Sequence, residues 1–305
     1  MLRLTEVLAD IHKHPRLGDS LVLKGGSALN LFFGPPERLS VDLDFNYVRS
    51  LEREAMLRER PLIERALVEI VRAQGYGVQL SGDAHAGRKF YLDYSRFDGL
   101  DDRVEIDVNY MYRICLLPVE ERSIWRPGEE PELRFPLLSF EEIAAGKLLA
   151  LLDRVAPRDA WDVARIPTLS TNPWPGDRLR SIFVAFSGAL PHPLHAYDRS
   201  RIERLDEKEI QRRLHPMLRS GHRPRSEELV EKAWAVVRPF LDLTPAEREY
   251  IDRLQSGDFQ PQLLFPEDAE LAERLQQHPV LLWKAKNATE HAGRAARPER
   301  DGRKG

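Results

Sequence analysis

Two segments of the chain alternate apolar and polar residues, and this alternation constrains the fold more than any other feature. Residues 41–48 (VDLDFNYV) and residues 104–111 (VEIDVNYM) both carry an aliphatic or aromatic side chain at every second position. Because successive side chains of a β-strand point to opposite faces, each segment is predicted to form a strand with one apolar and one polar face. Aspartate and glutamate are poor strand formers, so acid pairs on two strands indicate a role beyond folding.

The polar faces of these strands carry four carboxylates: Asp42 and Asp44 on the first, Glu105 and Asp107 on the second. Unpaired neighbouring carboxylates repel and raise one another's pKa, and a divalent cation removes that penalty. If the strands are neighbours, three carboxylates can converge on one or two Mg²⁺ ions, or on Mn²⁺, and support in-line displacement at phosphorus. We predict Asp42, Asp44 and Asp107 as the metal ligands, with Glu105 as the alternative third ligand. A solvent-facing edge strand is the competing interpretation of the D-x-D pair.

A glycine pair lies ahead of the first acidic strand. Residues 20–24 (SLVLK) form a short apolar run that predicts a buried strand ending at Gly25 and Gly26. Residues 27–33 are predicted to form a short helix with Ser27 near its N-cap. N–H groups at a glycine-rich turn that opens a helix bind phosphate, although a strand-to-helix turn with Gly26 at positive φ is the simpler explanation of the glycines alone. Together with the acids, the pair favours phosphate binding.

A single lysine interrupts an apolar helix further along the chain. In the stretch IAAGKLLALL, Lys147 is the only polar side chain, and a helix this apolar is predicted to be buried. Its ammonium either reaches solvent, pairs with a structural carboxylate, or is directed at the triphosphate of a nucleotide. Asp159 and Asp162 lie on one face of the following helix, with Arg154 and Arg158 nearby. They form either a salt-bridge cluster that orients Lys147 or part of the catalytic machinery.

Composition and length place these motifs in a soluble protein of two parts. The 305 residues carry a formal net charge of −3, which favours no class of partner, and one cysteine, which excludes an intramolecular disulfide. Neither a signal peptide nor a membrane span is predicted, so we expect a cytoplasmic protein. Residues 1–135 mix strands and helices and are predicted to form an α+β catalytic domain, and residues 136–289 a mostly helical domain. Residues 290–305 are predicted to be disordered.

Residues 90–94 are predicted to form a further strand, and periodicity and caps predict several helices. Residues 52–74 carry apolar residues at helical spacing, among them Leu62 and Ile70. Ser139, with Glu142 three residues later, forms a capping-box pattern at the start of the lysine-bearing helix. A further helix is predicted near residue 158, and another begins after the N-cap pattern TPAE at residues 244–247.

These motifs together resemble the AbiEii/AbiGii (MenT-like) toxin family of nucleotidyltransferases, a branch of the DNA polymerase β-like superfamily. The resemblance covers nearly the whole chain and is carried by LVLKGGSALNLFF, RLSVDLDF, RVEIDVNY and SFEEIAAGKLLALLDRVAPRDAWDVA. It implies a nucleotidyltransferase fold with a small mixed β-sheet flanked by helices, followed by a mostly helical C-terminal domain. It also implies Mg²⁺-dependent transfer of NMP from an NTP, release of pyrophosphate, and a cognate antitoxin.

The resemblance can be carried over residue by residue. Gly26 and Ser27 match the family's phosphate-binding glycine–serine pair, Asp42 and Asp44 its metal-binding pair, and the downstream motif falls on Lys147 and Asp162. We therefore expect the catalytic residues to be Asp42, Asp44, Asp107, Lys147 and Asp162. The nucleotide-binding candidates are Gly25, Gly26, Ser27, Ser40, Lys147 and Arg158.

The acceptor of the transferred nucleotide is less constrained. Some family members modify the 3′ end of tRNA, and residues 210–225 (IQRRLHPMLRSGHRPR) contain five arginines and no acid, so they either contact RNA phosphates or form a solvated helix face. Arg88 and Lys89 are further candidates for triphosphate or RNA contacts. We expect tRNA as the acceptor. The alternatives are a protein hydroxyl, a small molecule of the aminoglycoside type, or a catalytically silent module that binds NTP or antitoxin.

Overall fold

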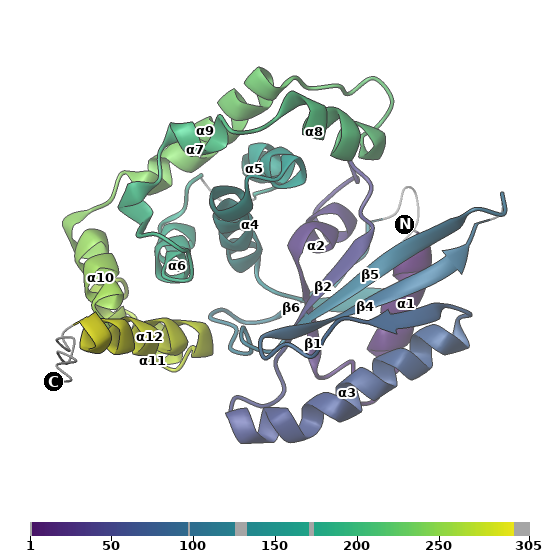
Figure 1. Cartoon of the computed structure of the whole chain (residues 1–305), viewed down its shortest axis with the longest axis horizontal. Helices are drawn as coiled ribbons and strands as arrows, with labels where there is room; N and C mark the ends of the chain where they lie inside the picture. Colours follow the sequence, from purple (N-terminus) through teal and green to yellow (C-terminus); the bar gives the residue numbers. More distant parts are fainter. Residues whose placement is uncertain (1, 97, 126–132, 171–173, 296–305) are drawn as a thin grey trace, which may run out of the picture.

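Seven strands form one mixed β-sheet in the computed structural model, which describes residues 2–96, 98–125, 133–170 and 174–295. In spatial order the strands are β3 (Gly77–Leu80), β4 (Gly87–Ser95), β5 (Asp101–Asn109), β2 (Asp42–Tyr47), β1 (Leu21–Lys24), β7 (Arg134–Leu137) and β6 (Glu120–Ser123). β2 pairs in parallel with β5, and β1 with β7, whereas the other neighbours are antiparallel. This mixed sheet with helices on both sides (Figure 1) matches the predicted fold class.

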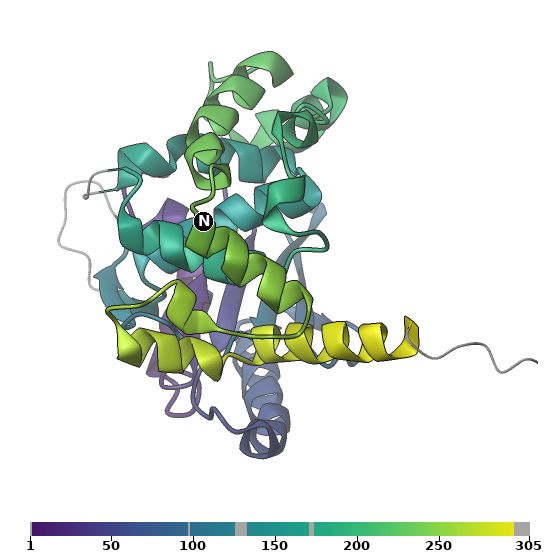
Figure 2. The same ribbon diagram turned by 90° about the vertical axis from the view of Figure 1, so that its left-hand side faces the viewer.

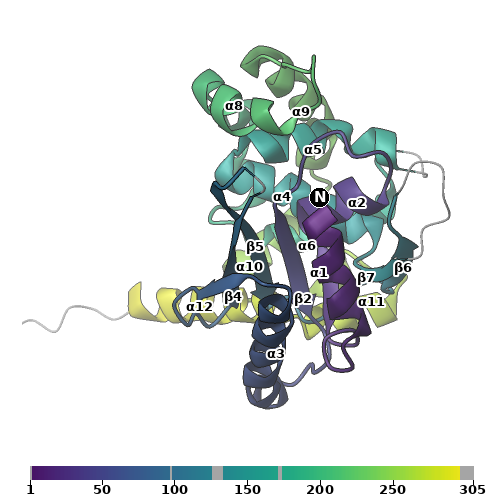
Figure 3. The same cartoon turned by 90° about the vertical axis from the view of Figure 1, so that its right-hand side faces the viewer.

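The two faces of the sheet differ in chemistry. Helices α1 (Leu2–Lys13) and α3 (Arg53–Ala73) lie on one side, and α2 (Gly25–Phe32) and α4 (Phe140–Arg154) lie on the other (Figures 1 and 3). Phe45 points toward α1 and α3, where its ring packs 5.9 Å from that of Phe135. Since side chains alternate along β2, Asp42 and Asp44 point toward α2 and α4. The polar face predicted from sequence is therefore the face that the second helical layer covers.

Four predicted strands are confirmed, and the two acidic strands are neighbours, as the carboxylate prediction requires. The segments predicted at residues 20–24, 41–48, 90–94 and 104–111 correspond to β1, β2, β4 and β5. β2 and β5 are neighbours, and their parallel register places Asp44 opposite Asp107 and Asp42 opposite Glu105. The strands β3, β6 and β7 were not predicted, because each has only four residues and none alternates clearly.

Two helix predictions need correction. α2 begins at Gly25, and its N-cap is Lys24, which makes no side-chain capping bond, so Ser27 lies inside the helix. Gly25, and not Gly26, has the positive φ (75°). In α3, Leu62 is 40% exposed, whereas Ile63 is fully buried. The helix predicted over residues 52–74 is therefore present as α3, and of the apolar residues named for it Leu62 lies on the exposed side, whereas Ile70 packs against the core.

The remaining helices form an arch over the polar face of the sheet (Figures 1 and 2). α4 packs against α6, and α5 packs against α9. The boundary expected after residue 135 falls inside β7. These helices are α5 (Pro157–Leu169), α6 (Asp177–Ser187), α7 (Arg199–Ile202), α8 (Glu207–Arg213), α9 (Ser226–Leu241), α10 (Pro245–Gln255), α11 (Ala269–Gln276) and α12 (Pro279–Ala295).

The ends of these helices test the capping and tail predictions. At α10, Thr244 and Glu247 form the complete capping box. α12 projects from the body of the protein (Figure 2) and continues to Ala295, so the prediction of a disordered tail from residue 290 is wrong for its first six residues. Residues 296–305 of that predicted tail lie outside the described residues.

The assignment of the apolar face predicts the effect of a core substitution. Phe45→Ala should lower the free energy of unfolding by about 3–5 kcal/mol, because a fully buried aromatic ring is lost and a cavity remains. Urea denaturation measures this change. Leu62→Ala, on the exposed side of α3, should change it by less than about 0.5 kcal/mol. Equal effects of the two substitutions would contradict the assignment.

Candidate active site

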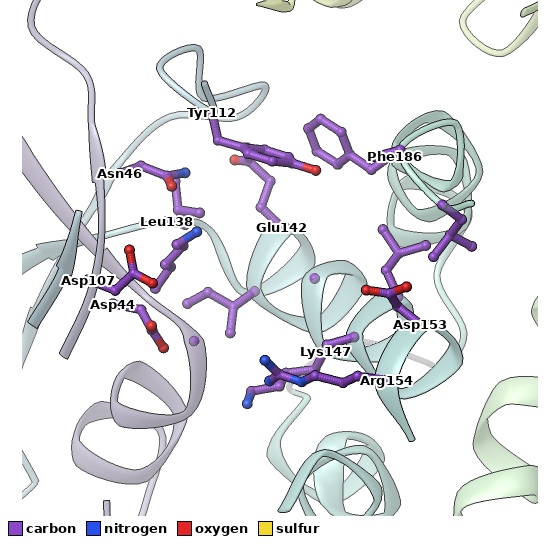
Figure 4. Close-up of a pocket in the computed structure, with 18 of the residues that line it drawn as sticks. Asp44, Asn46, Asp107, Tyr112, Leu138, Glu142, Lys147, Asp153, Arg154 and Phe186 are labelled. Atoms are coloured by element: carbon purple, nitrogen blue, oxygen red, sulfur yellow. The ribbon is translucent and has the colours of Figure 1, made fainter. Parts of the chain in front are cut away.

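A pocket of about 380 Å³ lies between the polar face of the sheet and helices α4 and α6 (Figure 4). Asp44 and Asp107 form its sheet wall. Lys147 and Arg154 of α4 line a second side, which we call the cationic wall. Tyr112 and Phe186, which Figure 4 shows away from the cationic wall, form an aromatic wall together with apolar residues such as Leu190 and Ile114. A pocket with acidic, basic and aromatic walls has the chemistry to hold a metal ion, phosphates and a flat base.

Asp44 is a buried carboxylate beside another carboxylate, and it has no ion-pair partner among the described residues. Burial and the neighbouring charge of Asp42 raise the pKa of Asp44 above its ordinary value, and none of the ion pairs between described residues includes it. Asp42 does not line the pocket. Its Oδ2 lies 3.4 Å from Nη1 of Arg158 on α5. The two acids of the D-x-D pair therefore share one face of β2 but have different partners.

The second acidic strand contributes Asp107 to the pocket. Asp107 lies 3.6 Å from Nζ of Lys89, which pairs more closely with Glu105. Only Asp107 of these two acids lines the pocket, which favours it over Glu105 as a functional residue. Arg88 points to the opposite side of the sheet, where it pairs with Asp83 at 3.3 Å and Glu64 at 4.0 Å.

The carboxylates can be compared with what a divalent metal requires. Within the described residues, no three His, Cys, Asp or Glu side chains are grouped closely enough to hold a metal ion. The predicted set is separated because Asp42 turns to Arg158 and Asp107 turns to Lys89. Mg²⁺ needs only one or two carboxylates when phosphate oxygens and water complete its coordination. Asp44, with its raised pKa and its neighbours Asp42 and Asp107, fits that role.

Both glycines lie where a side chain would collide with site residues. A Cβ at Gly25 would lie less than 3.0 Å from the carboxylate of Asp44, and one at Gly26 less than 3.0 Å from the guanidinium of Arg38. Ser27 Oγ contacts Ser40 Oγ at 2.6 Å and donates to the backbone carbonyl of Asp42. Of the glycines and serines predicted to bind the nucleotide, only Gly25 lines the pocket. Gly26 makes room for the cationic wall, and the serines join α2 to the start of β2.

Lys147 belongs to a buried network of charges. Its Nζ lies 3.1 Å from Asp159 and 2.9 Å from Asp162. Asp159 also accepts from Arg154 at 2.6 Å, and both oxygens of Asp162 accept from Arg38 at 2.7 Å. Burial disfavours the charged form of Asp162, but the positive charges of Lys147 and Arg38 outweigh this effect and lower the pKa of Asp162 below its ordinary value. Of the interpretations drawn from sequence, the ion pair with structural carboxylates describes Lys147 in this structure.

Several residues that line the pocket or support it were not identified from sequence. Arg38 is 3% exposed and reaches Asp162 across 124 positions of the chain, a pairing that no local pattern signals. The rings of Tyr112 and Phe186 lie 5.6 Å apart, and each packs against the buried ring of His278. Burial lowers the pKa of His278 to about 3, so it is neutral. Lys24 could have been noticed as the one charged residue that ends an apolar strand directly before the glycines.

The arginine-rich segment is less cationic than its sequence indicates. Arg212 and Arg213 pair with Glu209, which immediately precedes the segment. Among the described ion pairs none involves Arg219, Arg223 or Arg225. The segment lies beside the loop before β2. The amide of Leu39 in that loop donates to the carbonyl of Met217 at 2.7 Å, and the backbones of Arg38 and Leu218 form an isolated antiparallel β-bridge.

Comparisons with known proteins agree with this arrangement. The sequence matches the family model described as nucleotidyl transferase AbiEii toxin, type IV TA system, over residues 6–236. No curated protein matches the sequence. Among solved structures, MenT4, a nucleotidyltransferase toxin from Mycobacterium tuberculosis H37Rv, has a similar fold. The two structures superpose with a TM-score of 0.51 and share 18% sequence identity. The superposition covers 94% of this chain and 90% of the MenT4 chain.

The fold and the family match together define a nucleotidyltransferase. The chain belongs to the AbiEii family of nucleotidyltransferase toxins, which act in type IV toxin–antitoxin systems. This confirms the family, the fold class and the enzyme class predicted from sequence. The family generally uses an NTP and a divalent metal, and a toxin of this kind has an antitoxin as its partner. In the part of the chain that the structure describes, no helix has the length and apolar character of a membrane span.

The close approach at Gly25 predicts the effect of adding a methyl group. Gly25→Ala should lower nucleotidyl transfer by about 100-fold. The new Cβ would overlap the carboxylate of Asp44 and force it to move, and a shift of about 1 Å in a catalytic group can cost that much. Gly75→Ala is the matched control, since Gly75 has φ 86° and no atoms near its Cβ position. Both variants carry the strain of positive φ, about 1–3 kcal/mol, but only the first should lose transfer. Comparable activity of the two variants would refute a positional role for Asp44.

Glu142 predicts a pH dependence of stability. It lines the pocket and accepts from the amides of Leu116 and Leu117 at 2.9 and 3.1 Å. It also accepts from the hydroxyl of the cap residue Ser139 at 3.2 Å, and not from the backbone amide of Ser139 as in a full capping box. Burial, opposed by these hydrogen bonds, raises the pKa of Glu142 from 4.5 to about 7. A raised pKa in the folded state stabilises the protein below pH 4.5, and this contribution is lost as the pH rises through about 7.

We therefore expect the wild type to lose about 3 kcal/mol of unfolding free energy relative to Glu142→Gln over that pH range. Urea titrations of both proteins at pH 4.5 and pH 8 measure the difference. Parallel behaviour of the two proteins would show that Glu142 is ionised throughout.

Proposed function

We propose that this toxin transfers the nucleoside monophosphate of an NTP to RNA, specifically to the 3′ end of tRNA, with release of pyrophosphate and with Mg²⁺ as its metal. The observation that carries the proposal is the pocket itself, in which acidic, cationic and aromatic walls enclose one nucleotide-sized space. We place the base against Tyr112 and Phe186 and the triphosphate toward Gly25 and Lys147.

The carboxylates are assigned to the metal. Asp42, Asp44 and Asp107 would hold it, and a divalent ion bound there supplies charge neutralisation of the phosphates and activation of the attacking hydroxyl. The attacking oxygen bonds to the α-phosphorus, the bond from that phosphorus to the bridging oxygen breaks, and pyrophosphate leaves with the electron pair. Mn²⁺ satisfies the same oxygen ligands. Ser27 and Ser40 support this wall by fixing the backbone of Asp42.

The cationic wall binds and orients the triphosphate. Lys147 already has two carboxylate partners, so a bound triphosphate competes with Asp159 and Asp162 for its three donors. Asp162 is a positioning residue in this scheme, because it touches Lys147 and Arg38 and does not line the pocket. Arg158 lies 3.4 Å from Asp42, and it would be free to contact a phosphate if that carboxylate held a metal ion instead.

The RNA acceptor is assigned to the side of the arginine-rich segment. Arg219, Arg223 and Arg225 are cations without a described ion pair, and their segment contacts the loop that leads into β2. Phosphates of an acceptor stem bound there would bring its end toward the D-x-D pair. In a cytoplasmic toxin–antitoxin pair, an antitoxin would keep this activity in check until it is removed.

A labelling experiment tests the function. Purified protein is incubated with Mg²⁺, each labelled NTP separately, and either total tRNA or total cellular protein. We expect label on tRNA, and at least a 100-fold loss with Asp42→Ala, Asp44→Asn or Lys147→Ala. Asp102→Asn, an exposed acid on the same strand as Asp107, is the control that should keep full transfer.

Each other outcome has a defined meaning. Label on protein alone would replace RNA by a hydroxyl-bearing protein acceptor, and label on neither would favour a silent NTP-binding or antitoxin-binding module. Full transfer by Asp44→Asn would overturn the site assignment. EDTA should abolish transfer, and Mg²⁺ or Mn²⁺ should restore it.

A further inference from the structure

Among the described residues, three cations line the pocket, and only one of them forms no ion pair. Lys147 is paired with Asp159 and Asp162, and Arg154 is paired with Asp159. Lys24 also lines the pocket, yet no carboxylate oxygen of the described residues lies within 4.0 Å of its Nζ. Lys24 is therefore the pocket cation that a bound anion can reach without first displacing a carboxylate.

Lys24 lies between the sheet wall and the aromatic wall. It is the last residue of β1 and stands opposite Asp44 in the antiparallel register. Its Nζ lies 5.5 Å from the centre of the Tyr112 ring. A nucleotide with its base at the aromatic wall and its metal-bound phosphates at the sheet wall must pass this position. The group of the nucleotide that lies between base and pyrophosphate is the ribose with its α-phosphate.

The electrostatics favour an anion at this point. Burial lowers the pKa of Lys24, and the charges of Asp44 and Asp107 oppose that effect. No carboxylate oxygen of the described residues lies close enough to form an ion pair with Lys24, so its partly buried ammonium has no hydrogen-bonded counter-ion in the pocket. A phosphate oxygen restores the balance through a charge-assisted hydrogen bond.

We propose that Lys24 binds the α-phosphate of the NTP, the phosphate that is transferred. This assignment rests on the function proposed above and adds a substrate contact to it. It also separates the roles of the two lysines: Lys24 contacts the reacting phosphate, and Lys147, held in place by two carboxylates, serves the triphosphate from the opposite wall.

Equilibrium binding without an acceptor tests this proposal, because no transfer takes place. The wild type and Lys24→Met are titrated calorimetrically with each of the four NTPs, and then with the monophosphate and the nucleoside of the preferred base. We expect Lys24→Met to bind both the NTP and the monophosphate about 10- to 100-fold more weakly, since a charge-assisted hydrogen bond is lost. Nucleoside binding should be unchanged.

Controls separate this role from a structural one. Lys24→Arg keeps the positive charge, and its affinity for the NTP should be within a few-fold of that of the wild type. If Lys24→Met does not fold, Lys24→Arg still tests whether a positive charge at this position is enough for binding. Lys232→Met removes a lysine that pairs with Glu228 on α9, outside the pocket, and should change nothing. Equal weakening of nucleoside and NTP would identify Lys24 as a structural residue.

The remaining outcomes are equally decisive. Loss of NTP affinity with normal monophosphate affinity would move the contact away from the α-phosphate and overturn the proposal. Unchanged NTP affinity in Lys24→Met would overturn it while leaving the transferase function intact. A wild type that binds none of the four NTPs would overturn both the proposal and the function on which it rests.

Discussion

A chain of alternating charges, buried except for Arg154 at its end, holds the pocket together. Asp162 lies between Arg38 and Lys147, and Asp159 lies between Lys147 and Arg154. Removing one partner from such a buried pair leaves an uncompensated charge, at a cost of about 3–5 kcal/mol. Because its members come from the loop before β2, from α4 and from α5, the network fixes where the cationic wall stands relative to the sheet.

The sheet wall depends on the opposite principle, since it keeps like charges close together. The parallel register of β2 and β5 places Asp44 beside Asp107, and the neighbouring charges contribute to the raised pKa of Asp44. This repulsion is offset on the other face of the same strands, where Leu43, Phe45 and Ile106 are fully buried. One face of the sheet supplies stability, and the other is free to hold neighbouring carboxylates whose repulsion a bound cation would relieve.

Features set by residues that are neighbours in the sequence could be predicted, whereas contacts between distant parts of the chain could not. Alternation identified the long strands because burial and side-chain direction share a period of two. Helical spacing identified α3, but it did not decide which apolar residues are buried, because adjacent pairs such as Leu62 and Ile63 define two possible stripes. The start of α2 was missed because its N-cap side chain makes no capping bond. The contact of Arg38 with Asp162 joins residues 124 positions apart, and nothing near either residue indicates it.

The position of Arg38 also limits how the chain can be divided. A fragment that ends after β7 would keep the carboxylates but lose the helices that carry Lys147 and Asp162. A fragment that begins at α4 would keep Asp162 without Arg38, which covers both of its oxygens. The helical half could therefore be exchanged with that of a relative, and Asp162 still be fully paired, only if the loop before β2 were exchanged with it.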